Sequence, residues 1–294
     1  MPLAKLIGWG DERLPLALRF FGWKSRYVET SRGTLHYFDV KGTGSGPPFL
    51  LIHGLGSRAA DYALLVRRLR PLTRRLILPD LPGHGWSHRE TPDPDDLRAV
   101  LEEALATLAP EPAYVLGNSL GGLIAVRVAV HSPQRVRALI LLSPGGAPMN
   151  ETQISQLKGL FIINTFSQGR HFVNKLLAVR PRIWPLLVWG TMARLRRPSV
   201  AHLLNHVNND HLLQPEDIAG LTMPVWLFWG NADGILDAAQ LQWYRDHLPS
   251  HAVVELPDGY GHSPFMDRPG HFVSRLRAFL DSLGPEVAAE VKTG

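Results

Sequence analysis

The chain has 294 residues, no cysteine and a formal net charge of +5. Its length suits one compact core with an insertion. The lack of cysteine excludes disulfides, thiol nucleophiles and thiolate metal sites, and it fits a cytoplasmic protein. No glycine-rich loop of the kind that cradles phosphate and no recognised nucleic-acid-binding motif is present, so we expect no metal, no cofactor and no nucleic acid.

Residues 1–26 form a basic, aromatic-rich amphipathic segment. Asp11 and Glu12 interrupt the apolar core that a secretory signal needs, and no apolar run is long enough to span a membrane. Two interpretations stay open. Such a segment can lie peripherally in a lipid interface, or it can pack across another part of the protein or a dimer interface. Its large apolar residues are Leu3, Leu6, Ile7, Trp9, Leu14, Leu16, Leu18, Phe20, Phe21 and Trp23.

Two short apolar runs then lead into glycine-rich loops. Residues 49–52 read as a buried strand that ends in His53-Gly54-Leu55-Gly56-Ser57, and residues 76–78 lead into a loop over 79–87. Histidines in such loops more often brace the backbone than transfer protons. We therefore assign structural roles to His53, His84 and Asp80.

The most informative motif is Gly117-Asn118-Ser119-Leu120-Gly121. It follows the apolar run 113–116 and precedes a helical stretch over 123–130. A serine on a sharp strand-to-helix turn must hold a strained backbone, and glycines two residues to either side allow neighbouring elements to approach. The turn also places the hydroxyl at a helix N-terminus, where partial positive charge favours a developing anion. The motif predicts that Ser119 is a nucleophile.

Between residues 143 and 223 the strand-helix alternation stops. The pattern there predicts helices over 154–166, 171–178, 183–195 and 199–208. The segment from Pro148 to Thr222 contains eight basic and four acidic residues, and its apolar residues are more numerous than a core alone requires. An apolar underside would enclose an apolar substrate and a basic outer face could meet an anionic surface. Alternatively, these residues only pack the insertion onto the core.

The last part of the core supplies an acid and a base. Strand-like residues 225–229 run into a turn with Asp233, and residues 253–256 run into a turn with His262. A serine hydroxyl needs a base to remove its proton, and imidazole needs a carboxylate to fix its tautomer. We assign His262 as the base and Asp233 as the acid. Asp237 and Asp258 are less well placed alternatives.

Together these segments resemble the α/β-hydrolase superfamily over about residues 25 to 285, with further likeness to serine esterases and lipases of the monoacylglycerol lipase type. The resemblance implies an α/β fold with a mostly parallel central sheet flanked by helices and an inserted helical cap. It also implies an oxyanion hole made by the backbone N–H groups of Leu55 and Leu120. Serine at the elbow argues against a likeness to haloalkane dehalogenases and epoxide hydrolases, which use aspartate.

The resemblance divides the chain into five parts. Residues 1–26 are the amphipathic segment, 27–146 and 223–284 are the two parts of the hydrolase core, 147–222 are the cap, and 285–294 are a C-terminal tail.

The expected activity is hydrolysis of carboxylic esters with an apolar acyl chain, including monoacylglycerols, on small-molecule substrates. The alternative is a carbon-carbon bond hydrolase of aromatic catabolism acting on a vinylogous diketo acid. Asn118 is similar to the residue before the serine in those enzymes, whereas Ser263 stands where they usually carry tryptophan. A ligand receptor without activity is a third hypothesis, and retention of all three triad candidates argues against it.

Overall fold

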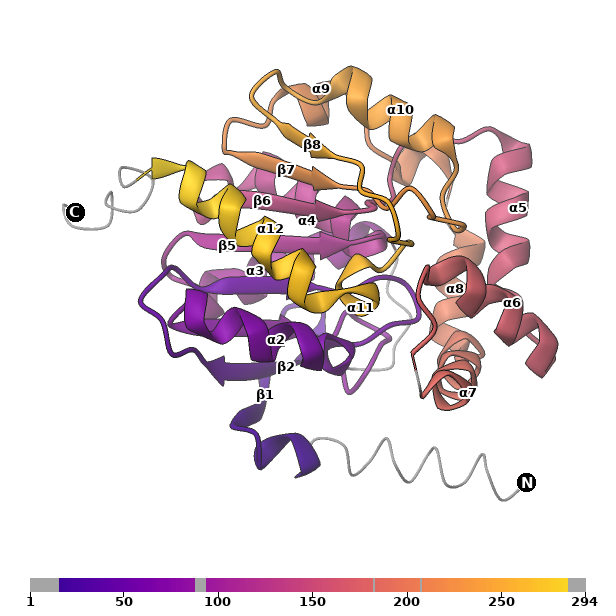
Figure 1. Ribbon diagram of the computed structural model, residues 1–294, viewed down its shortest axis with the longest axis horizontal. Helices are drawn as coiled ribbons and strands as arrows, with labels where there is room; N and C mark the ends of the chain where they lie inside the picture. Colours follow the sequence, from indigo (N-terminus) through magenta and orange to yellow (C-terminus); the bar gives the residue numbers. More distant parts are fainter. Residues whose placement is uncertain (1–15, 88–93, 182, 207, 285–294) are drawn as a thin grey trace.

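A computed structural model describes residues 16–87, 94–181, 183–206 and 208–284. Its centre is an eight-stranded sheet in the order β1-β2-β4-β3-β5-β6-β7-β8 (Figure 1). β2 runs antiparallel to β1 and β4, and the other neighbouring pairs are parallel. The strands are β1 (Trp23–Thr30), β2 (Gly33–Lys41), β3 (Phe49–Ile52), β4 (Arg75–Pro79), β5 (Ala113–Asn118), β6 (Val136–Leu142), β7 (Val225–Phe228) and β8 (Val253–Glu255).

Helices cover both faces of this sheet. α2, α11 and α12 pack on one face, and α3, α4, α9 and α10 pack on the other (Figure 1). Every residue of β3, β5, β6 and β7 is buried, which explains why these strands appear as continuous apolar runs. The bounds are α2 (Ala63–Leu69), α3 (Pro94–Leu108), α4 (Leu120–His131), α9 (Pro215–Ala219), α10 (Ala238–His247), α11 (Pro264–Asp267) and α12 (Pro269–Ser282), with 3-10 turns η1 (Ala59–Tyr62), η2 (Arg70–Leu72), η3 (Pro133–Arg135) and η4 (Asn209–His211).

Four helices follow β6 and lie together beyond the carboxyl ends of the parallel strands (Figure 1). We call α5 to α8 the cap. The helix predicted over 154–166 is wrong in its bounds, because Thr165 accepts a hydrogen bond from Gln168 N at 3.2 Å and thereby starts a new helix. The cap helices are α5 (Glu151–Phe161), α6 (Phe166–Leu176), α7 (Trp184–Leu195) and α8 (Pro198–His206).

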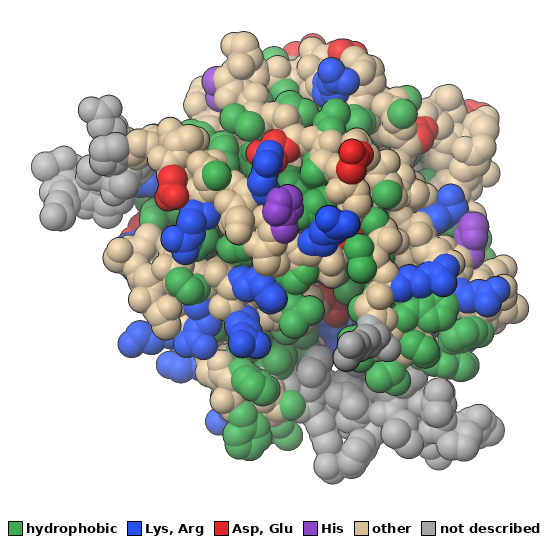
Figure 2. Space-filling model, in the orientation of Figure 1, with side chains coloured by type: hydrophobic (Ala, Val, Ile, Leu, Met, Phe, Trp, Pro, Cys, Tyr) green, Lys and Arg blue, Asp and Glu red, His purple; other side chains and the backbone are tan. Residues whose placement is uncertain are grey.

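The first strand begins inside the expected N-terminal segment. We expect that segment to extend through residue 26, but β1 starts at Trp23, whose ring packs edge-on against Phe38 with the ring centroids 5.1 Å apart. Pairing with β2 and burial of Trp23 explain the difference. Phe20 is 91% exposed, and apolar side chains gather at the lower edge of Figure 2. Residues 1–15 and the expected tail at 285–294 lie outside the described residues.

Candidate active site

Ser119 lies on the turn between β5 and α4 with a backbone φ of 55°. A positive φ is strained for any residue with a side chain, so surrounding contacts must hold it. Ser119 N donates to Leu142 O at 3.1 Å, and Ser119 O accepts from Gly122 N at 2.8 Å and Gly145 N at 2.9 Å. The next strand and its loop therefore fix the turn.

Glycine is required on both sides of Ser119. A Cβ atom on Gly117 would lie 2.2 Å from Gly121 O, and one on Gly121 would lie 2.1 Å from Ile52 O. The elbow is thus in backbone contact with both its own helix and β3. The sequence predicted this close approach from the glycine spacing, and the structure supplies its partners.

His262 and Asp233 are paired in the loops that follow β8 and β7. The Nδ1 atom of His262 lies 2.8 Å from Asp233 Oδ2, and both side chains are almost fully buried. The other carboxylate oxygen of Asp233 accepts from Ile235 N at 2.8 Å, which fixes its orientation. The two alternative acids have other partners: Asp237 caps α10, and Asp258 accepts from Asn231 at 2.8 Å.

Asn118 connects the serine turn to the histidine loop. Its Nδ2 atom donates to Leu142 O and to His262 O, both at 2.9 Å, and its Oδ1 accepts from Ser263 Oγ at 3.4 Å. In the sequence, Asn118 is notable only for its similarity to the residue before the serine in carbon-carbon bond hydrolases. In the structure its amide is directed at protein atoms and holds the two loops together.

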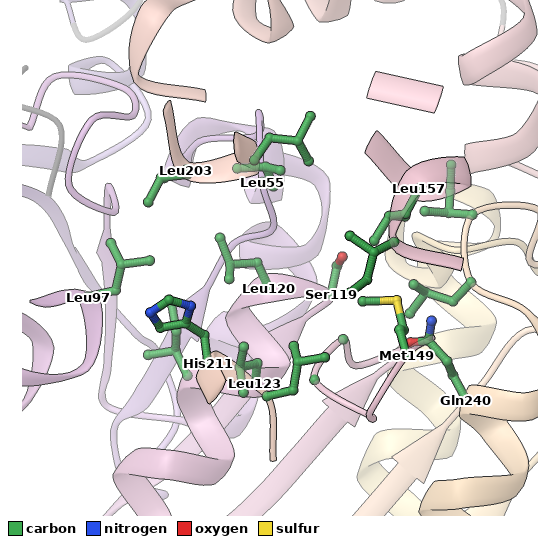
Figure 3. A pocket seen from close by; sticks show the side chains of 18 of the residues that line it. Leu55, Leu97, Ser119, Leu120, Leu123, Met149, Leu157, Leu203, His211 and Gln240 are labelled. Carbon is green, nitrogen blue, oxygen red and sulfur yellow. The ribbon is translucent and has the colours of Figure 1, made fainter. Parts of the chain in front are cut away.

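The loop after β3 lies against the serine. A Cβ atom on Gly54 would be 3.1 Å from Ser119 Cβ, and Leu55, Ser119 and Leu120 line one cavity (Figure 3). Leu120 is the first residue of α4, so its N–H has no acceptor within the helix. The amides predicted to form an oxyanion hole therefore belong to segments that meet at Ser119.

Gly56, in the same loop, is held from both sides. Its N–H donates to His84 Nε2 at 3.0 Å, and its carbonyl accepts from Arg194 Nε at 3.0 Å. Arg194 belongs to α7 of the cap and also lies 3.6 Å from Asp61. Arg194 is not evident as a site residue from the sequence alone, because no local pattern shows that a cap arginine reaches this loop.

The other loop residues have the structural roles that we assigned to them. Asp80 Oδ2 lies 2.8 Å from His36 Nδ1, and Asp80 Oδ1 accepts from Ala59 N at 2.8 Å. His53 Nε2 accepts from Leu81 N at 3.0 Å. These contacts join the loop after β3 to the loop after β4.

We expect His84 to make the fold sensitive to acid. Burial, followed by the charge of His53, lowers the pKa of His84 from 6.5 to about 3. Below about pH 6.5 the unfolded chain binds a proton that the folded chain does not bind until about pH 3. As the pH is lowered from about 6.5 to about 3, the free energy of unfolding should therefore decrease by up to about 1.4 kcal/mol per pH unit.

Urea denaturation at several pH values in this window, on the wild type and on His84→Gln, measures the effect. Glutamine can still accept from Gly56 N but does not titrate, so the variant should lose less stability per pH unit. An identical pH dependence in the two proteins would contradict the prediction.

Ser119 lies where two cavities meet. One is apolar and is lined by Leu120, Leu123, Met149 and Leu157 among others (Figure 3). The other is smaller and is lined by His262 and the more polar Ser57, Asp61, Thr191 and Arg194. Leu55, Ser119, Phe161 and Ile235 line both.

His202 and His206 are four residues apart on α8, a spacing that can bind zinc. Their rings stack with centroids 3.9 Å apart. Within the described part of the chain, however, no group of three or more histidine, aspartate or glutamate side chains is arranged to hold a metal ion. Over the same residues, no helix has the length and apolarity needed to cross a membrane.

A model of the alpha/beta hydrolase family matches residues 49–276. The chain belongs to this family. Pimeloyl-[acyl-carrier protein] methyl ester esterase of Xylella fastidiosa is 32% identical over 84% of this chain and 99% of its own length. The enzyme of the same name from Nitrosomonas europaea is 29% identical over 80% of this chain and 96% of its own.

Solved structures of other proteins have the same fold as this alpha/beta hydrolase. A bacterial membrane phospholipase A has a TM-score of 0.78 at 21% identity and covers 95% of this chain and 94% of its own. A meta-cleavage product hydrolase from Pseudomonas fluorescens has a TM-score of 0.75 at 19% identity, and the match covers 88% of this chain and 98% of the hydrolase. The predicted fold class is confirmed.

Proposed function

We propose that this chain hydrolyses carboxylic esters with an apolar acyl chain through a Ser119-His262-Asp233 triad. At the level of reaction class, the chain is a carboxylic ester hydrolase, like its curated relatives. The single observation that carries the finer proposal is the strained Ser119 in a cavity with His262, whose ring is fixed by Asp233 at 2.8 Å.

In the proposed reaction His262 takes the proton of Ser119 as the serine attacks the ester carbonyl. Asp233 holds the ring tautomer and stabilises the imidazolium that forms. The backbone N–H groups of Leu55 and Leu120 donate to the oxyanion, each such donor contributing about 2.7 to 4 kcal/mol to barrier lowering. Water then hydrolyses the acyl-enzyme with His262 as base.

The two cavities suggest where each part of the ester lies. His262 must return its proton to the leaving alcohol, so the alcohol belongs in the cavity that His262 lines. The acyl chain then occupies the apolar cavity on the other side of Ser119. This arrangement supports an apolar acyl group.

Hydrolysis of p-nitrophenyl esters from acetyl to palmitoyl tests the proposal, with monoacylglycerols and methyl esters included. Methyl esters are included because the relatives' names specify one. We expect turnover to rise from acetyl to longer chains as more apolar surface is buried. Hydrolysis of short esters alone would contradict the apolar acyl site.

Arg194 is the observation that favours the alternative, a carbon-carbon bond hydrolase, because it places a cation in the cavity beside Ser119. Its contacts with Gly56 and Asp61 instead support a role in holding the loop. Turnover of a vinylogous diketo acid without turnover of any ester, while a fluorophosphonate still labels Ser119, would favour the alternative.

We also propose that residues 16–21 contact anionic lipid surfaces. Phe20 and Phe21 are 91% and 70% exposed, and Arg19 and Lys24 flank them. Exposed apolar side chains beside basic ones are typical of interfacial segments. Ile183 and Leu186 of the cap region are 63% and 67% exposed and add apolar surface.

Replacing both aromatic residues (Phe20→Ser, Phe21→Ser) should weaken binding to anionic vesicles about tenfold or more, because the two aromatic side chains that would insert into the lipid are lost. Co-sedimentation with vesicles measures this. Leu64→Ser is the matched control, since Leu64 is 58% exposed on α2. Equal binding by the wild type and the double variant would contradict the proposal.

A further inference from the structure

Gln240 is a buried polar side chain in the wall of the apolar cavity. It lies in the first turn of α10 and is only 4% exposed. Its side chain extends toward Met149, and both residues line the cavity beside Ser119 (Figure 3). Among the described residues, the Oε1 atom of Gln240 is buried and has no hydrogen-bond partner.

Helix capping does not explain this glutamine. The contact that starts α10 runs from Gln240 N to Asp237 Oδ1 at 3.1 Å and uses only the backbone of Gln240. A buried amide oxygen without a partner destabilises a fold, whereas leucine or methionine would fit an apolar wall at no such cost. The amide is therefore better explained by a bound molecule than by folding.

The charged side chains of the same cavity have protein partners instead. Arg98 contacts Glu102, Arg127 donates to His211 O at 2.8 Å, and Lys158 donates to Asn205 O at 3.3 Å. Gln240, whose Oε1 atom has no partner, is thus placed to recognise a substituent on an otherwise apolar chain.

We infer that Gln240 recognises a hydroxyl group on the acyl chain, so that hydroxyacyl esters are the preferred substrates. The inference rests on the proposed function, which places the acyl chain in this cavity. A hydroxyl group can donate to Oε1 and accept from Nε2, so it satisfies both ends of the amide. An unsubstituted alkyl chain leaves Oε1 without a partner.

Binding of methyl octanoate and of methyl hydroxyoctanoates, with the hydroxyl moved one carbon at a time, tests the inference. Ser119→Ala protein is used so that no ester is cleaved, and isothermal titration calorimetry gives each Kd. We expect one hydroxy isomer to bind about fivefold to tenfold more tightly than methyl octanoate, as one added hydrogen bond allows.

In the same background, Gln240→Leu and Gln240→Met should abolish that preference and strengthen binding of methyl octanoate. Two variants are used so that misfolding of one does not decide the result, and thermal melts check both. Gln242→Leu is the matched control, because Gln242 lies on the same helix, is exposed and contacts Asp246.

Equal binding of all isomers, or a preference that survives in both Gln240 variants, would overturn the inference. Hydrolysis of methyl octanoate by the wild type is measured in parallel. It tests the proposed function separately, because binding to the Ser119→Ala protein does not depend on turnover.

Discussion

Ser119→Ala should abolish ester hydrolysis, reducing turnover by about 10⁴-fold or more, because it removes the hydroxyl that is proposed to form the acyl-enzyme. Labelling by a fluorophosphonate should disappear as well. The fold should persist, since the backbone N–H and carbonyl of residue 119, not its hydroxyl, make the contacts that hold the turn. Rates on the p-nitrophenyl ester series and mass-spectrometric detection of the labelled serine measure both effects.

Ser143→Ala is the matched control for this substitution. Ser143 also has a positive φ, of 38°, at the end of the neighbouring strand β6, and its buried Oγ has no hydrogen-bond partner among the described residues. Its replacement should leave hydrolysis and labelling close to wild type. Turnover by Ser119→Ala that stays well above about one ten-thousandth of the wild-type value would mean that Ser119 is not the nucleophile.

Asp233→Asn should reduce kcat about 10⁴-fold, the loss that the equivalent change causes in a serine protease triad. The carboxylate accepts from the Nδ1 side of His262 at 2.8 Å. An amide nitrogen in that position would favour the tautomer with its proton on Nε2, where it cannot accept the proton of Ser119. Substrate binding should change little, so that KM stays near its wild-type value while kcat falls.

Asp258→Asn is the control for Asp233→Asn, because it also removes one carboxylate charge near the site but leaves the partner of His262 in place. Asp258 contacts Asn231 at 2.8 Å and has no hydrogen bond to His262 among the described contacts. We expect it to retain most of the wild-type kcat. A nearly silent Asp233→Asn together with an inactive Asp258→Asn would show that the acid has been assigned wrongly.

Much of the site is local in sequence and therefore predictable. Glycine is required at 117 and 121 because a Cβ atom there would lie 2.2 or 2.1 Å from a backbone oxygen, and such a constraint appears directly in the residue pattern. Buried parallel strands are continuous apolar runs, so the predicted strand at 49–52 coincides with β3. Because the carboxyl ends of parallel strands share one edge, the loops after β3, β5, β7 and β8 could be expected to meet there.

The cap illustrates partial predictability. Its helical character follows from apolar periodicity, but the break between α5 and α6 depends on the Thr165 cap, a short-range polar contact that periodicity does not register. The start of β1 at Trp23 is not evident from the sequence for a related reason. β1 and β2 are an antiparallel pair at the edge of the sheet, and most residues of β1 are exposed. The exposed basic residues of β1 therefore resemble those of an amphipathic helix.

The sequence by itself determined the fold class, the elbow and the order of serine, aspartate and histidine along the chain. Only the tertiary structure decided which distant side chains reach the site. Arg194 contacts Gly56 across 138 positions of the chain, and Asn118 contacts His262 across 144. Gln240 lines the apolar cavity because α10 packs beside the loop that follows β6, where the Tyr244 hydroxyl donates to Gly145 O at 2.7 Å. Such contacts are set by how helices and loops pack in three dimensions, and no pattern of neighbouring residues encodes them.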